Sequence, residues 1–402
     1  MQPIAQVYSP GAAPVKVSRK TFTRDPTFPY NRLHGIRRGS TRLSRPTLLD
    51  VAHAAEVDRS TASRALDPAR SHLLKPETIA RVTEAARRLG YHGNALASSL
   101  RRGRTNSVGI VIADFQNPFI SPILRGVENG LDKLGIVPLV TETEDSSARL
   151  ESAINTLLRH RPDAIIMTAV RSGDRAIIDR TAESVPVVLA VRTFRDTSFA
   201  AVAHDDREGG VLAAQHLIAL GHTRIAQLCG PSDVSSFVER AAGFRRTLRA
   251  AGLPLTNLTE SARAPGVASG YQLMQRLLKN LATWPTGVFA HTDLMAVGAI
   301  DAAREAGLRC PEDVSVIGYD DIPLADHVDP PLTTVRLPGY QLGRLAAELV
   351  ATMIGDETAS RPNLSLPPEL VVRRSTAPAA FAGSDRPGNA TKPATGRVAT
   401  PS

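Results

Sequence analysis

Short apolar runs alternate with helix-length amphipathic stretches over most of the chain, and this alternation constrains the fold more than any other feature. The runs occupy residues 108–114, 164–169, 185–190, 224–228, 287–290 and 314–320. Strands that are apolar throughout are typical of parallel sheets covered by helices on both faces. Six such strands lie in the segment 106–374, which is longer than one compact lobe. We therefore expect an α/β body of two lobes built from βαβ units.

Three short helical patterns precede this body. Thr47 and Asp50 have capping-box spacing ahead of the first pattern, and Asp58 is a candidate N-cap for a second helix at 59–66. A third pattern runs from Pro76 to Leu89 and stops at a glycine. Three short helices, the first two joined by a tight turn, indicate a helix-turn-helix module.

The second of these helices carries the candidate base contacts. In a helix-turn-helix, the N-terminal side chains of the second helix face base edges in the major groove. Those side chains are Arg59, Ser60, Ser63 and Arg64. Arginine can bind guanine through two hydrogen bonds, and serine accommodates several bases. The alternative reading is a small helical cap with surface arginines.

The charge distribution favours a polyanionic partner at the N-terminal end. The formal net charge is +9, yet residues 1–105 alone hold 19 Lys and Arg against 7 Asp and Glu. The remaining chain is therefore mildly acidic. A basic head on an acidic body is typical of a protein that binds DNA at one end, although a solvated basic tail would have the same composition.

Cysteine content and hydropathy exclude several classes of protein. The two cysteines, Cys229 and Cys310, cannot build a disulfide framework or a four-ligand zinc site by themselves, which favours a reducing, cytoplasmic location. The first residues lack an apolar core of signal-peptide length, and no run of eighteen apolar residues follows, so we expect neither export nor a membrane span. The histidines His204, His222 and His291 lack metal-ligand spacing. We therefore expect no metal and no cofactor.

The segment between head and body, 94–101, has the composition of a marginal helix. Eight residues are too few to hold a helix alone in water. Such a segment suits a hinge that becomes ordered only when it docks on DNA, and an ordinary linker turn is the alternative.

These patterns together resemble the LacI/GalR family of bacterial repressors. The resemblance extends from Thr47 to Thr376, about four-fifths of the chain, and five motifs occur in the family's order. They are TLLDVAHAAEVDRSTASRAL, LGYHGNALASSLRRGRT, VGIVIADFQNPFISPILRGVE, HTDLMAVGAIDAAREAGLRCPEDVSVIGYDDIPLADHVDPPLTTVR and LPPELVVRRST.

For the head, the resemblance implies a homodimer on a pseudo-palindromic double-stranded operator. Two hinge helices of such a dimer enter the minor groove together, and by match Leu100 is the leucine that wedges between base pairs, with Arg101 beside it. Thr47 and Leu48 at the start of the first helix and Asn94 at the start of the hinge complete the expected DNA contacts.

For the body, the resemblance implies a two-lobed sensor similar to the type I periplasmic binding proteins, with a small-molecule effector between the lobes. A sugar or a sugar acid is expected from the ligands of the family, and Arg240 and Arg192 favour an anionic group on the ligand. The expected effector contacts are Phe119, Ile120, Arg192, Arg240, Pro265, His291 and Asp293.

Alternatives stay open for three of these effector contacts. The sequence pattern predicts that Asp293 and Arg240 each open a helix after a strand, where ligands of α/β folds bind. Asp293 is alternatively a helix N-cap, and Arg240 a member of a surface ion pair. His291 is either a lining residue or incidental.

The chain departs from the family pattern at several positions. Glu56 replaces the glycine of the turn between the first helices, where a left-handed residue costs about 1 kcal/mol. Gly93 stands in place of a proline before the hinge, and Lys75 replaces the usual Ser/Thr cap of the third helix. The loop at 67–73 is about two residues longer than the common pattern, and Val191 replaces an acid of the expected effector site.

The sequence thus predicts a repressor whose effector changes the angle between two lobes. We expect a disordered basic extension at 1–44, the head at 45–92, hinge and linker at 93–105, the body at 106–374 and a disordered tail at 375–402. Lobe one is expected at about 106–203 and 312–339, and lobe two at about 204–311 and 340–374.

No GxSxG, Walker or HExxH motif supports an enzyme, and an exported sugar-binding protein would need a signal sequence and no head.

Overall fold

A computed structural model describes residues 46–67, 70–91, 104–195, 198–254, 259–261, 264–279, 284–356 and 358–379. The chain forms two compact units that divide between Gly93 and Asn94. This division falls beside the boundary expected between head and hinge. The expected hinge at 94–101 and the extension at 1–44 lie outside the described residues.

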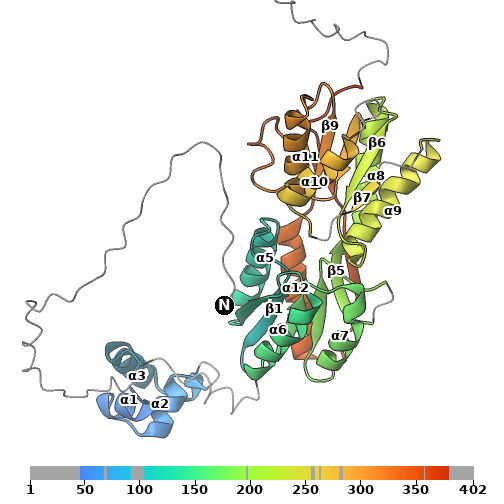
Figure 1. Cartoon of the computed structure of the whole chain (residues 1–402). Coiled ribbons are helices and arrows are strands. Elements are labelled where there is room, and N and C mark those ends of the chain that lie inside the picture. Colours follow the sequence, from blue (N-terminus) through green and yellow to red (C-terminus); the bar gives the residue numbers. More distant parts are fainter. Residues whose placement is uncertain are drawn as a thin grey trace, which may run out of the picture. The chain divides into compact units, whose positions relative to one another are not determined.

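The first unit consists of three helices around a small core (Figure 1). The elements are α1 (Leu48–Ala54), α2 (Arg59–Ala65), the 3-10 turn η1 (Ser71–Leu73) and α3 (Pro76–Leu89). Thr47 and Asp50 form the expected capping box of α1, and Asp58 caps α2 by accepting from the backbone N–H of Thr61 at 2.8 Å. The buried residues are Val51, Ala52, Ala55, Ala62, Ala65, Val82, Ala85 and Ala86. Mostly alanines fill this core, so the helices approach closely.

Two departures from the family pattern have visible consequences in the head. Glu56 has a φ of 52°, so the turn between α1 and α2 keeps the left-handed conformation that a glycine would adopt without strain. Lys75 makes no side-chain hydrogen bond to the first turn of α3, and Pro76 occupies the first helical position instead. The helix-turn-helix geometry therefore persists at the cost of a strained turn.

The second unit contains two six-stranded sheets with helices between their strands (Figure 1). In chain order the elements are β1 (Ser107–Ile112), α5 (Ile120–Asp132), β2 (Val137–Glu142), α6 (Ser147–Arg159), β3 (Ala164–Met167), η2 (Ser172–Asp174), α7 (Arg175–Ala182), β4 (Val187–Ala190), β5 (Ala200–His204), α8 (Asp206–Ala219), β6 (Ile225–Cys229), α9 (Ser235–Ala250), β7 (Thr259–Ser261), α10 (Val267–Leu277), β8 (Gly287–Ala290), α11 (Asp293–Glu305), β9 (Ser315–Asp320), β10 (Thr333–Arg336), α12 (Gly339–Gly355), β11 (Asn363–Leu366) and β12 (Glu369–Val371).

The two sheets repeat one topology. The first sheet has the order β11-β5-β4-β3-β1-β2 and is parallel throughout. The second has the order β12-β10-β9-β8-β6-β7, and only its edge strand β12 is antiparallel. The strand order reverses beside β1 in the first sheet and beside β6 in the second, and ligands of open α/β sheets bind at such points. The expected α/β body of two βαβ lobes is confirmed.

The expected assignment of the C-terminal segments to the two lobes is wrong. Strand β9 pairs with β8 in the second sheet, and β10 continues that sheet, so residues 312–336 belong to lobe two. Helix α12 packs on α5, and β11 pairs with β5 in the first sheet, so residues 339–366 belong to lobe one. The physical reason is that β9 extends the parallel sheet that β8 already forms, without a crossing between lobes.

Three chain crossings connect the lobes. The first lies between β5 and α8 at Asp205, the second between β10 and α12 at Leu337 and Pro338, and the third between β11 and β12. Each crossing is only a few residues long, so side chains at its ends stay beside both lobes.

Close helix packing fixes one side of lobe two. A Cβ atom on Gly210 of α8 would lie 2.1 Å from the carbonyl oxygen of Arg240, and one on Gly243 of α9 would lie 1.9 Å from that of Arg207. Neither contact is possible for a larger residue without moving a helix. The two glycines thus let α8 and α9 touch along their backbones, which places Arg240 beside the start of α8.

Candidate DNA-contacting helix and interlobe site

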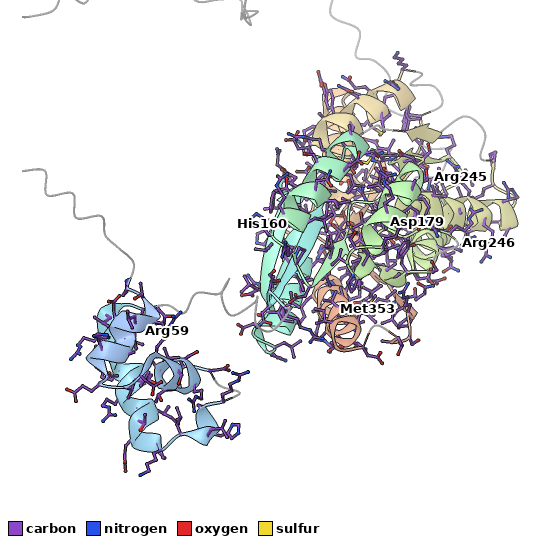
Figure 2. All side chains as sticks on the ribbon, turned by 90° about the horizontal axis from the view of Figure 1, so that it is seen from below. Arg59, His160, Asp179, Arg245, Arg246 and Met353 are labelled. Atoms are coloured by element: carbon purple, nitrogen blue, oxygen red, sulfur yellow. The ribbon has the colours of Figure 1, made fainter. Side chains whose placement is uncertain are left out.

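Helix α2 presents its polar side chains in two neighbouring rows. Arg59 and Ser63 are four residues apart and form one row, and Ser60 and Arg64 form the other. Arg59, Ser60 and Arg64 are exposed, and Ser63 is half-buried. Figure 2 shows Arg59 at the surface of the head. The face of α2 opposite the alanine core therefore carries all four expected base contacts.

Hydrogen bonds hold one of these rows in place. The Arg64 guanidinium donates to Ser60 Oγ at 2.8 Å, and Ser60 Oγ donates to Asp58 Oδ1 at 2.6 Å. Asp58 also accepts from the Thr61 hydroxyl at 2.6 Å. The hydrogen bonds from Ser60 and Thr61 hold the pKa of Asp58 well below its usual range. Ser60 thus orients Arg64 in the free protein.

The other expected DNA contacts of the head have structural partners. Thr47 is exposed and takes part in the capping box of α1, and Leu48 packs against the alanine core. Asn94, Leu100 and Arg101 lie outside the described residues.

In the body, the strongest cluster surrounds Arg240. Its Nε donates to Asp206 Oδ1 at 2.7 Å, and its Nη1 donates to the carbonyl oxygen of His291 at 2.5 Å. Its Nη2 lies 3.8 Å from Asp320 Oδ1. The guanidinium carbon is 3.8 Å from the ring centre of Tyr319, whose hydroxyl donates to Asp206 Oδ1 at 3.0 Å. Arg240 is therefore a buried cation held from four directions.

The structure corrects two statements about Arg240. Helix α9 begins at Ser235, so Arg240 lies in its second turn and does not open the helix. The ion pair of Arg240 is buried, with 3% of the residue exposed, so the surface-pair alternative is wrong. Burial alone would lower the pKa of Arg240, but the carboxylates of Asp206 and Asp320 outweigh it and raise that pKa. The guanidinium stays charged.

His291 is fully buried beside this cluster, and its hydrogen bonds define its tautomer. Nδ1 accepts from the backbone N–H of Gly230 at 3.1 Å. Burial and the charge of Arg240 lower the pKa of His291, so the ring is neutral and Nε2 carries the proton. The side-chain amide of Gln227 lies 2.9 Å from Nε2, and its oxygen is the atom that accepts this proton. His291 therefore aligns the strand ends of lobe two, and its carbonyl holds Arg240.

Asp293 lies at the first position of α11, but it does not cap the helix. Thr292 is the N-cap and accepts from the backbone N–H of Met295, so the N-cap alternative for Asp293 is wrong. Asp293 instead accepts from the Thr334 hydroxyl at 2.5 Å and from the backbone N–H of Ile322 at 2.8 Å. Burial raises the pKa of Asp293 to about 7. One donor on strand β10 and one just after strand β9 thus converge on one buried carboxyl.

Arg192 is placed by a strained turn at the end of β4. Val191 has a φ of 69°, and the Arg192 N–H donates to the carbonyl oxygen of Ala190 at 2.7 Å, which defines a γ-turn that is rare for a β-branched residue. The Arg192 guanidinium donates to Asp145 Oδ1 at 2.6 Å. Arg192 is thus already paired inside lobe one.

The lobes are joined by a polar bridge at their facing strand ends. Arg171, which follows β3, donates to both oxygens of Asp233 in lobe two at 2.8 and 2.9 Å and lies 2.9 Å from Asp145 in lobe one. The backbone N–H of Ser172 donates to the carbonyl oxygen of Asp233 at 2.8 Å. Nearby, the N–H of Thr193 donates to Ser235 Oγ at 2.9 Å. These contacts link the two sheets directly beside the reversal points of their strand order.

The remaining expected effector contacts lie in different surroundings. Phe119 precedes α5, is 7% exposed, and its ring centre lies 5.8 Å from that of His204 at the end of β5. Ile120 is half-buried and packs against the core shared with α12. Pro265 follows the edge strand β7 and is half-buried. Phe119 thus reaches the crossing between lobes, while Pro265 belongs to the sheet edge.

Several residues of this site were missed from the sequence. They are Asp145, Arg171, His204, Asp206, Asp233, Tyr319 and Asp320. Each follows a strand or lies at a strand end, which is the one sequence signal that could have found them. The structure brings Arg240, His291 and Asp293 together around β6, β8 and β9. Phe119 adjoins this group through its ring contact with His204.

The described residues show two further features. No helix among them is long and apolar enough to cross a membrane. They also hold no group of three or more His, Cys, Asp or Glu side chains placed to bind a metal ion.

Family models match both units of the chain. The model for bacterial regulatory proteins of the lacI family matches residues 47–94, and the model for a periplasmic binding protein-like domain matches residues 214–376. The first match covers the three-helix head. The second covers most of lobe two, together with α12 and β11 of lobe one.

Similar proteins extend the match over both units. The ribose operon repressor of Escherichia coli K12 is 34% identical over 331 residues, 82% of this chain and 99% of that protein. The HTH-type transcriptional regulator DegA of Bacillus subtilis is 32% identical, over 83% and 98% of the two chains.

Solved structures agree. A lac repressor dimer bound to operator and the anti-inducer ONPF superposes with a TM-score of 0.75 at 28% identity, covering 83% of this chain and 99% of that chain. A regulator from Enterococcus faecium with bound ribose has a TM-score of 0.61 at 31% identity, over 68% of this chain and all of that one. The order of the helices and the two sheets described above agree with these matches, which extend over both units. The chain belongs to the lacI family of DNA-binding bacterial transcriptional repressors.

Proposed function

We propose that the protein is a homodimeric repressor whose affinity for a pseudo-palindromic operator is set by a hydroxyl-rich, uncharged effector bound between the two lobes. The observation that carries this proposal is the convergence of buried polar side chains at facing strand ends, with Arg240 and Asp293 in lobe two and the Arg171–Asp233 bridge across the lobes. An effector that binds one lobe arrangement more tightly than the other changes the arrangement of the dimer.

The charges at this site favour a neutral effector over a sugar acid. Arg240 is already neutralised by Asp206 and Asp320, and Arg192 by Asp145. Asp206 and Asp320 are buried beside this guanidinium, and the carboxyl group of Asp293 is buried near Asp320. A further anion would be repelled there, while hydroxyl groups can donate to carboxylates and accept from arginine. The bound ribose of the Enterococcus faecium regulator has this chemistry.

For the DNA end, Arg59 and Arg64 are the proposed guanine contacts, with Ser60 and Ser63 beside them. The two basic side chains lie on one exposed face of α2. From the resemblance, Leu100 wedges into the minor groove at the centre of the site, flanked by Arg101, and Asn94 begins the hinge helix. A Leu100→Ala variant should keep helix propensity, lose operator bending and retain nearly all binding to random DNA.

A melting-temperature screen tests the effector part of the proposal. The panel contains ribose, glucose and cellobiose as neutral sugars, gluconate as a sugar acid, and adenine as a ligand without hydroxyl groups. A true effector at about 100 times its dissociation constant should stabilise the protein by roughly 2.7 kcal/mol. The same compound must change operator affinity, because stabilisation without a change in DNA binding would contradict the proposed coupling.

A further inference from the structure

His204 has a buried hydrogen-bonding atom that the protein leaves without a partner. Among the side-chain nitrogen and oxygen atoms of the described residues, only His204 Nε2 and Gln227 Oε1 are buried and unpaired. The orientation of the Gln227 amide toward His291 accounts for the second atom. His204 is 5% exposed, so water does not supply the missing partner freely. Buried polar atoms are rarely unpaired, so each one needs an explanation, and a ligand group that donates a hydrogen bond is one such explanation.

The second nitrogen of the ring shows that the unpaired atom is an acceptor. The His204 ring hydrogen-bonds to the backbone of Pro338, which raises its pKa. Proline has no backbone N–H, so its carbonyl oxygen must be the acceptor and the ring nitrogen the donor. Because Nε2 is unpaired, this donor is Nδ1. Burial and the charge of Arg240 nevertheless lower the pKa of His204 to about 3, so Nε2 keeps its lone pair.

The location of His204 puts this acceptor at the junction of the lobes. The residue ends β5 of lobe one, two positions before Asp206 begins α8 of lobe two. Pro338, which accepts the hydrogen bond from the His204 ring, lies in the second crossing. The His204 ring lies beside the ring of Phe119, with ring centres 5.8 Å apart. Two of its neighbours, Phe119 and Arg240, are proposed effector contacts. The acceptor thus stands between the apolar wall of lobe one and the charged cluster of lobe two.

We propose that His204 is an effector-binding residue whose Nε2 accepts a hydrogen bond from a hydroxyl group of the effector. This inference rests on the proposed function and deepens it, because it assigns a hydroxyl donor to the part of the ligand that reaches the crossing. The Nδ1–H bond to Pro338 fixes the ring between two of the three crossings. Ligand binding at Nε2 therefore acts on the segment about which the lobes move.

Two substitutions separate the two ring nitrogens. In His204→Asn, the amide can still donate to Pro338, but no atom reaches the position of Nε2. In His204→Gln, the longer side chain can place an acceptor near that position, while the donor to Pro338 is lost. Both variants lose the ring that faces Phe119, so this contact cannot explain a difference between them. His216→Asn is the control, since His216 lies on α8 and bonds Thr376 at 3.0 Å, away from the crossing.

Binding of ribose, glucose, cellobiose and adenine is measured by calorimetry on the full chain and its variants. We expect a neutral sugar to bind His204→Asn on the order of 10-fold more weakly than wild type, because its hydroxyl group loses its acceptor in a buried site. His204→Gln should stay within about 3-fold of wild type, since a neutral hydrogen bond is retained. The His216→Asn control should bind normally.

The outcomes distinguish this inference from the proposed function. Equal sugar binding by wild type and His204→Asn, or equal losses in the Asn and Gln variants, would overturn the role of Nε2. Binding of adenine alone would overturn it too, while leaving a small-molecule effector in place. If no compound binds, both proposals fail. Imidazole 15N spectra of the wild type give a check without a variant: the Nε2 resonance must move when the sugar is added, and an unchanged resonance rejects the contact.

Discussion

Arg171 of lobe one donates two hydrogen bonds to the carboxylate of Asp233 in lobe two, at 2.8 and 2.9 Å. The same guanidinium lies 2.9 Å from Asp145 of its own lobe. Arg171 is mostly buried, whereas 49% of the Asp233 side chain is exposed. The bridge therefore joins a fixed cation to a solvated anion, and it forms only while the strand ends of the lobes face each other closely.

Loss of this bridge should open the lobes. In Arg171→Ala, we expect the closed arrangement to lose about 1 kcal/mol, since half-exposed ion pairs contribute little, and its population to fall about five-fold relative to the open one. Energy transfer between dyes on α7 and α10 reports this population. Arg180→Ala removes an ion pair with Glu151 inside lobe one and serves as the control. An unchanged distance distribution in Arg171→Ala would show that the bridge does not govern lobe closure.

The base contacts of α2 should distinguish operator from random DNA. We expect Arg59→Ala or Arg64→Ala to weaken operator binding by roughly 1–3 kcal/mol, because each arginine can form a bidentate pair with guanine. Ser60→Ala should cost less, since it frees Arg64 from its hydrogen bond and removes only a hydroxyl group that accommodates several bases. Fluorescence anisotropy at one fixed salt concentration measures both DNAs. Arg81→Ala on α3 removes the same charge at another exposed position of the head, and equal losses in all variants on both DNAs would indicate phosphate contacts only.

The strained turn of the head predicts a stabilising substitution. Glu56 is exposed with a φ of 52°, so Glu56→Gly should stabilise the head by up to about 1 kcal/mol. Amide hydrogen exchange of α1 and α2 in the full chain measures this stability. The matched control is Glu84→Gly in the interior of α3, which should destabilise the head by about 1 kcal/mol. Faster exchange in Glu56→Gly would mean that the glutamate side chain contributes more than the turn costs.

Asp293 should make stability depend on pH. Its pKa is about 7 in the folded chain against 3.8 for an ordinary aspartate, so the folded state binds the proton more tightly. The bound proton therefore stabilises the folded state fully at a pH below the pKa of Asp293 in the unfolded chain. This stabilisation is lost as the pH rises through the pKa of Asp293 in the folded chain. Asn can keep both hydrogen bonds, with its oxygen facing Ile322 N–H and its amide facing the Thr334 hydroxyl.

The Asp293→Asn variant isolates this effect. Between pH 5 and pH 8, we expect wild type to lose up to about 3 kcal/mol of unfolding free energy relative to this variant. Urea unfolding at several pH values measures the difference. Asp301→Asn, on the exposed side of the same helix, should run parallel to wild type. Parallel curves for Asp293→Asn and wild type would place the Asp293 pKa near its ordinary value.

Local signals in the sequence predicted the elements but not the long-range pairing. The capping box at Thr47, the cap at Asp58 and the span Pro76–Leu89 agree with the structure, because each depends on residues within one turn. The assignment of 312–339 to lobe one was wrong, because strand neighbours are chosen by packing between distant segments. The start of α9 at Ser235 was missed since no side chain caps that helix.

The effector site was predicted only in its framework. Arg240 and Asp293 were found through the family resemblance, but their partners Asp206 and Thr334 lie 34 and 41 residues away in sequence. Nothing in a linear pattern indicates that Arg192 is neutralised by Asp145, which is why a sugar acid was expected alongside a sugar. The unpaired Nε2 of His204 emerges only when all neighbouring donors are placed.

Coupling between the two ends of the molecule is tested most directly by one measurement on the full chain. Its operator is first selected from a random DNA pool, and the affinity for that site is then titrated with the neutral sugar that stabilises the protein. We expect a two-fold symmetric site bound by a dimer, and an affinity that the sugar changes in wild type and leaves unchanged in Asp293→Ala. A selected site without two-fold symmetry, or an operator affinity that no stabilising sugar changes, would contradict an effector-controlled dimeric repressor.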